Sequence, residues 1–422
     1  MSTDIIHQCA AESRDTGTVA PPAPPLLLRL VLYIFCFSLC FENYNPFGNE
    51  GTRVTFSKIM GILLFCLALY YPRFCFKKRS SLLGAFFWIL FWSSMATIYY
   101  AKNFSEATDT LLGVGLTLAQ CIVLFWVCCN LCVFPRVALG ALGGFAAGAV
   151  VMAIMLSMQI GVSTIIDLRG LPRISFLDTN ANLIGNWLAT AAVILMGILI
   201  ENYGKWGKAR WLLAAFFPFL FSAIAQTGSR GSLLLMAVGP LMFFFTKKPL
   251  SKKIQIFVAI ALVTAIMSVY VSQSEIMILR WRNTIERGDV AERDSLLSAS
   301  WELIKERPFF GWGFNAGPCE ISLMLFGNRG GPVDPHNVYT WLALTSGLVG
   351  VVPFLYIAYK LAAASIVARN GCWGCLPLAL LMLIVVQMGK GGGAYLSKLL
   401  WMNVGFIAAA AVLAGAGDKK AT

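Results

Sequence analysis

The chain has 422 residues, of which 58% are hydrophobic and only 13% are charged. Soluble domains average about 25% charged residues, so the composition excludes an ordinary soluble protein and indicates a polytopic membrane protein. The formal net charge of +13 does not point to nucleic acid, because the lysines and arginines gather in short clusters between apolar runs, as the positive-inside rule predicts. We therefore expect an all-α integral membrane protein.

Residues 1–25 contain a proline run and lack the basic start and apolar core of a cleavable signal peptide. We expect a disordered cytoplasmic tail there. About twelve transmembrane helices should follow, because twelve apolar stretches lie near the length of about 20 residues that a spanning helix needs. They are 26–41, 54–72, 81–100, 111–132, 136–159, 181–200, 209–226, 231–247, 254–272, 338–367, 375–390 and 396–416.

The basic clusters decide the orientation. Those following the second, sixth, eighth and tenth stretches fall on one side if the spans alternate, and that side should be cytoplasmic. The chain then divides into helices one to nine (26–272), an extracytoplasmic loop (273–337), helices ten to twelve (338–416) and a cytoplasmic tail (417–422). The tenth stretch contains Gly347, Gly350 and Pro353, which predicts either one kinked helix or a short helix packed on a longer one.

The loop 273–337 is the only long polar interruption, and we expect the active site in it. Residues 294–306 have apolar side chains at helical spacing, which predicts an amphipathic helix ending before Pro308. Gly311, Gly313 and Gly317 predict a turn-rich stretch after it. His336 is one of two histidines in the chain and lies where the loop re-enters an apolar run. It either shapes a turn or acts as a catalytic base with Asp334 as an orienting group.

Several arginines lie on the outward side, where the positive-inside rule predicts few basic residues. Arg230 lies in a short turn beside the hydrocarbon boundary, where it either reaches water or contacts phosphate, since a guanidinium matches two phosphate oxygens. Arg293 is explained equally well by helix charge pairing, and Arg169 and Arg173 by a solvated loop. A shared anionic ligand would account for all of them.

Other chemistry finds little support. No GxxxxGK[ST] loop for a nucleotide, no GxSxG stretch and no aspartate-rich sugar-nucleotide motif occur. The histidine and cysteine pattern predicts no metal site and no cofactor. Lys390, in Met388–Gly393, is a candidate for contact with phosphate or lipid at the outer face.

Four short motifs in this order resemble the O-antigen ligases of Gram-negative envelopes and their wider superfamily. The motifs are Asp178-Thr-Asn180 before one span, Ser229-Arg-Gly231 before another, Arg293 followed by Pro308 and Gly311-Trp-Gly313, and His336-Asn-Val-Tyr339 opening the next span.

The resemblance implies a metal-independent, inverting transfer of O-antigen polysaccharide. The donor would be O-antigen on undecaprenyl pyrophosphate, and the acceptor a sugar hydroxyl of lipid A–core at the periplasmic face of the inner membrane, among membrane lipids. His336 would be the general base, and Arg230 and Arg293 would bind pyrophosphate. Substrate contacts are expected from Arg169, Arg173, Asn180, Asn315, Asn337, Tyr339 and Lys390.

Two kinds of alternative remain open. Within the superfamily, an O-antigen polymerase or a protein O-oligosaccharyltransferase would use similar arginines with another acceptor. Outside it, a transporter of an anionic lipid-linked solute would use them as a vestibule. A transporter should carry ionisable groups near mid-membrane, whereas here the charged residues lie at one end of the spans.

Overall fold

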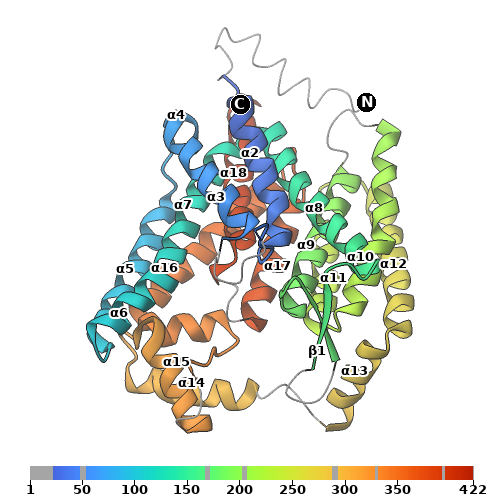
Figure 1. Cartoon of the computed structure of the whole chain (residues 1–422). Coiled ribbons are helices and arrows are strands. Elements are labelled where there is room, and N and C mark those ends of the chain that lie inside the picture. The colour runs from blue at the N-terminus through green and yellow to red at the C-terminus, as the bar shows by residue number, and fades with distance from the viewer. Residues whose placement is uncertain are drawn as a thin grey trace.

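The computed structural model describes residues 22–47, 54–166, 172–201, 207–287, 293–327, 331–391 and 395–421. The expected disordered tail lies almost entirely outside these residues. The described chain is almost wholly helical, which confirms the all-α class (Figure 1). Its strands are β1 (Val162–Ile166) and β2 (Pro172–Phe176), an antiparallel hairpin that the sequence patterns did not predict.

Among the described residues, eight helical segments are long and apolar enough to cross a membrane, and four shorter apolar segments lie within the other stretches expected to span. In chain order the helices are α2 (Leu26–Ser38), η1 (Leu39–Phe41), α3 (Phe56–Tyr70), α4 (Pro72–Cys75), α5 (Ser81–Tyr100), α6 (Phe104–Thr110), η2 (Leu111–Gly115), α7 (Leu116–Leu131), α8 (Pro135–Ser157), α9 (Ala181–Glu201), η3 (Gly207–Phe216), α10 (Phe217–Gln226), α11 (Arg230–Leu241), η4 (Met242–Phe245), α12 (Leu250–Gln273), α13 (Glu275–Arg287), α14 (Arg293–Glu306), α15 (Gly313–Phe326), α16 (Val338–Ala368), α17 (Leu376–Lys390) and α18 (Lys398–Ala421). Helix α18 thus continues through most of the expected C-terminal tail.

The helices α13, α14 and α15 and the β-hairpin lie at one end of the bundle, which we call the loop end. Helix α4, the start of α2 and the end of α18 lie at the opposite end (Figure 1). Helix α14 follows the amphipathic pattern expected for 294–306 and buries Leu296, Ala299 and Leu303. The stretch after it is less irregular than expected, because α15 includes Gly317. A side chain at that position would collide with Leu344, so the glycine permits helix packing there.

Helix α16 is broken at Gly347, whose φ of +57° is not helical. The structure therefore favours the second expectation, a short helix followed by a longer one. A break would leave backbone N–H groups without partners in an apolar environment. The loop supplies them, since Leu348 N–H donates to Pro308 O at 2.8 Å and Val349 N–H donates to Phe309 O at 3.1 Å. The Pro308–Gly313 motif thus stabilises the break in α16 through these hydrogen bonds.

Two interfaces depend on small residues. On α8, side chains at Gly144 and Gly148 would collide with backbone carbonyls of α2, so these glycines let the two helices touch. Helices α9, α11 and α17 meet in the same way at Gly239, where a side chain would collide with Val193 and Leu383. Helix α17 runs antiparallel to α9 and α11, so its C-terminus meets their N-termini at the loop end.

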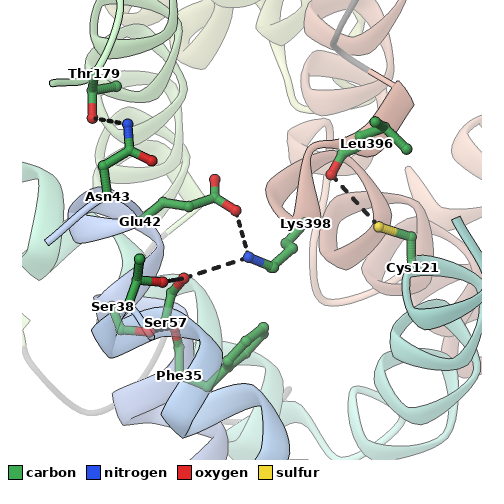
Figure 2. A network of polar contacts seen from close by, with 10 residues as sticks. Phe35, Ser38, Glu42, Asn43, Ser57, Cys121, Thr179, Leu396 and Lys398 are labelled. Atoms are coloured by element: carbon green, nitrogen blue, oxygen red, sulfur yellow. Dashed lines mark hydrogen bonds and ion pairs between the residues drawn. The ribbon is translucent and has the colours of Figure 1, made fainter. Parts of the chain in front are cut away.

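A polar network closes the bundle between its first and last helices. Lys398, at the start of α18, forms an ion pair with Glu42 and donates to Ser57 Oγ at 3.4 Å. Asn43 Nδ2 donates to Thr179 Oγ1 at 3.3 Å, and Cys121 Sγ donates to Leu396 O at 3.6 Å (Figure 2). These contacts tie the segment between α2 and α3 to α18 and to the start of α9.

Candidate functional site

The candidate site lies around the C-terminal end of α17. The last carbonyls of a helix have no partners inside it and favour cations. Here Arg293 Nη2 donates to Lys390 O at 3.3 Å, and Asn337 Nδ2 donates to Gly389 O at 3.4 Å. Arg293 begins α14 and Asn337 precedes α16, so two distant segments meet on one helix end.

The side chain of Lys390 contacts two further helices, α9 and α11. Its Nζ donates to Asn186 Oδ1 of α9 at 2.7 Å. The same ammonium lies against the backbone of Gly231 in the first turn of α11, where an added Cβ would be under 3.0 Å from Lys390. We call Asn186, Arg230, Arg293, Asn337 and Lys390 the α17-end cluster, because Arg230 directly precedes Gly231.

A tight turn orders the approach to Arg230. Gly228 has a φ of +62°, where a side chain would collide with Ile276 of α13. Arg280 of α13 packs over this turn with only 6% of its surface exposed, and its Nη1 donates to Gly228 O at 2.9 Å. Sequence reasoning gave Arg280 no role, although an arginine after the apolar run Ile276–Leu279 signals a buried partner.

His336 is exposed and adjoins the cluster through Asn337. Its backbone is in the left-handed region with a φ of +53°, a strained conformation that histidine tolerates better than most residues. Asp334 Oδ1 accepts the backbone N–H of His336 at 2.7 Å. The carboxylate therefore fixes the turn, and the imidazole makes no hydrogen bond to any residue that the structure describes.

Asn337 and Tyr339 complete this segment. The Asn337 side chain caps α16 by accepting from the backbone N–H groups of Tyr339 and Thr340. The Tyr339 hydroxyl donates to Val385 O of α17 at 3.0 Å. Both predicted residues thus fasten the start of α16 to α17.

An aromatic stack joins α15, α16 and the segment before α18. Tyr395 stacks on Trp341 with ring centroids 3.6 Å apart, and Trp341 stacks on Phe314 at 5.9 Å. Burial raises the pKa of Tyr395 well above its usual value, and the nearby Asp334 carboxylate adds to the rise. The Tyr395 phenol is therefore neutral at physiological pH.

Some predicted residues are not joined to the cluster. Asn315 Nδ2 donates to Glu106 Oε1 of α6 at 2.9 Å, away from α17. Asn180 accepts from the N–H of Asn182 at 2.8 Å and so caps α9. The backbone of Arg173 pairs with that of Ile165 in the hairpin. Arg169 lies outside the described residues.

Next to the cluster, an apolar groove of about 800 Å³ opens between α11, α12 and α13. It begins at Leu233, less than one helical turn from Arg230, and continues past Met236 and Met267. Arg282 and Glu286 form an ion pair at 2.8 Å along its edge. The rest of its lining is mostly apolar, as contact with a hydrocarbon chain requires.

Metal ligands do not accompany the cluster. Across the residues that the structure describes, no group of three or more histidine, cysteine, aspartate or glutamate side chains is placed to hold a metal ion. The side chains of the α17-end cluster are guanidinium, ammonium and amide groups.

Comparison with known families gives one match. Residues 214–355 match the O-antigen ligase family. This segment of the chain is similar to O-antigen ligases. This segment includes Arg230, Arg293 and His336 but not Asn186 or Lys390, which the fold adds from outside it. A search of curated proteins found no match for the chain.

The match confirms the expected relationship and supports glycosyl transfer of the O-antigen ligase or polymerase type, with lipid-linked sugar donors in general. Together with the apolar helices, it supports a multi-pass membrane protein.

Proposed function

We propose that the chain transfers O-antigen polysaccharide from undecaprenyl pyrophosphate to a sugar hydroxyl of lipid A–core, at the periplasmic face of the bacterial inner membrane. The observation that carries the proposal is the convergence at the end of α17. Arg293 and Asn337 contact the last carbonyls of this helix, and Lys390 reaches the first turn of α11 beside Arg230. Three cationic residues from separate segments suit a diphosphate.

In this proposal the cations bind the pyrophosphate of the donor. Guanidinium groups bind phosphate oxygens in pairs, and fixed donors stabilise the negative charge that develops as the leaving group departs. The groove between α11 and α12 would hold the polyprenyl chain, because its lining is apolar and it begins within one turn of Arg230. In this proposal the sugar would lie at the loop end.

His336 is proposed as the general base. It takes the proton of the acceptor hydroxyl, whose oxygen attacks the anomeric carbon as the bond to the pyrophosphate oxygen breaks. The products are the glycosylated acceptor, with an inverted anomeric centre, and undecaprenyl pyrophosphate. The exposed imidazole and its lack of a described partner suit a residue that meets its substrate from solvent.

The test uses cells with and without the gene. Loss of long glycan from lipid A–core, with accumulation of carrier-linked polysaccharide, is the expected result. Lipopolysaccharide that carries only short glycan, together with shortened carrier-linked chains, would instead identify a polymerase, for which the same cations would serve two carrier-linked substrates. A purified protein that transfers glycan only to a protein acceptor would identify an oligosaccharyltransferase.

A further inference from the structure

Asn186 was not expected to be functional, yet it is the hydrogen-bond partner that the structure gives to the Lys390 ammonium. Its Oδ1 accepts from Nζ at 2.7 Å. An ammonium has three donors, so two remain without an acceptor in the described part of the chain. The backbone carbonyl of Asn186 also accepts a hydrogen bond from Thr190 Oγ1, one turn further along α9, at 2.8 Å.

The opposite side of the ammonium is bounded by Gly231. A methyl group at this position would lie under 3.0 Å from Nζ, Cδ and Cε of Lys390. The backbone of Gly231 has no left-handed conformation that requires glycine, because it lies in the first turn of α11. The glycine is therefore explained by the space that Lys390 occupies.

We propose that Asn186 is a positioning residue which holds the Lys390 ammonium against Gly231, so that its two remaining donors bind the diphosphate of the donor lipid. The inference rests on the proposed function, since it assigns the donor's diphosphate to this position. A neutral amide is suited to the role. It orients the ammonium without cancelling its charge, as a carboxylate would.

Binding of farnesyl diphosphate to the purified, detergent-solubilised chain tests the assignment by calorimetry. In Asn186→Asp, the carboxylate should keep Lys390 in place but neutralise it and repel the ligand. We expect binding to weaken by about tenfold or more, because a charge-assisted hydrogen bond is lost. The KM for the donor should rise while the KM for the acceptor stays unchanged.

Two matched variants separate positioning from helix packing. Gln387→Met removes the bond from Gln387 Nε2 to Thr190 Oγ1, which joins α9 to α17 one turn deeper, and it should leave ligand binding unchanged. Gly231→Ala should weaken binding as Asn186→Asp does. Gly143→Ala, where an added methyl group meets nothing within 4 Å, should not. Thermal unfolding midpoints of all variants should lie close to that of the parent chain.

The outcomes distinguish the two proposals. Normal binding in Asn186→Asp, with loss in Arg230→Ala, overturns the role of Asn186 and leaves the proposed function intact. Weakening in Gln387→Met equal to that in Asn186→Asp also overturns it, because loosened helices would then explain both. A parent chain that does not bind the diphosphate overturns the proposed function itself.

Discussion

Two lysines at the loop end of the bundle have different surroundings. Lys398, at the start of α18, is paired with the carboxylate of Glu42 and also donates to Ser57 (Figure 2). Lys390, at the end of α17, donates to the neutral amide of Asn186, and its carbonyl accepts from Arg293. In the described part of the chain, no carboxylate pairs with Lys390.

The difference separates a structural charge from one available to a ligand. Removing an ammonium from water is costly unless a partner offsets the loss. At Lys398 the fold supplies that partner, so the charge is neutralised internally. At Lys390 the fold supplies only orientation, and a bound anion would complete the site. The following predictions, in decreasing size of effect, test whether the two regions behave as differently as they look.

The largest effect is expected at His336, beside the α17-end cluster. His336→Ala should slow the chemical step by about 10²–10⁴-fold, the range that general bases contribute. Single-turnover glycan transfer with saturating donor measures this, and diphosphate binding should be retained. A variant that transfers at nearly the parent rate would remove the base from the mechanism. Loss of donor binding would make His336 a pyrophosphate ligand.

The arginines come next. Arg230→Ala and Arg293→Ala should each lower kcat on the order of 10²–10³-fold, as removal of a fixed charge-stabilising donor does. Lysine should restore little at either position, because it cannot bind two oxygens in a plane. Both variants must reach the membrane in normal amounts, as judged by immunoblot. Near-normal ligation in both would reduce them to surface charges.

The two lysines should then show opposite effects. Lys398→Met leaves Glu42 without its partner in a position where only 29% of the carboxylate side chain is exposed. We expect a loss of about 1–2 kcal/mol of stability, since the pair is only partly buried. Lys390→Met should weaken donor binding but not lower the unfolding midpoint. Transfer per folded molecule should be normal in Lys398→Met.

A double variant sharpens this contrast. Glu42→Leu combined with Lys398→Met should recover most of the lost stability, because replacing both members of an ion pair removes the uncompensated charge. Thermal unfolding in detergent measures each member of the cycle. If the double variant is no more stable than Lys398→Met alone, the network contributes packing rather than charge balance.

The smallest effect concerns Cys319, which reports the side of the membrane that the loop end faces. Burial raises the pKa of the Cys319 thiol, and the Glu106 carboxylate raises it further. Less thiolate is therefore present at neutral pH, and the rate of maleimide labelling should still be rising above about pH 8.5, where an ordinary thiol is half ionised.

Labelling uses intact cells and an impermeant reagent, with Cys319 as the single cysteine. The control is a Lys77→Cys variant lacking Cys319, because Lys77 is exposed at the opposite end of the bundle. It should be labelled only after permeabilisation. The reverse pattern would contradict a periplasmic loop end.

Residue patterns along the chain predicted more of the helices than of the site. Apolar length identified the twelve helical segments, since hydrocarbon thickness imposes a length on any spanning helix. The helix at 294–306 followed from side-chain spacing. The hairpin of β1 and β2 was missed, because ten residues of irregular alternation carry little signal. Helix α15 was missed because its glycines suggested turns, whereas Gly317 serves packing against Leu344.

By itself, the sequence determined the class of protein and some of the residues of the candidate site, because hydropathy and short motifs are local properties. Arg230, Arg293, Asn337 and Lys390 were all identified in this way. Only the tertiary structure brought them together at the end of α17, since that depends on helices far apart in the chain packing through Gly239 and Gly231. It also added Asn186, whose role comes from one contact across 204 residues that no pattern along the chain can indicate.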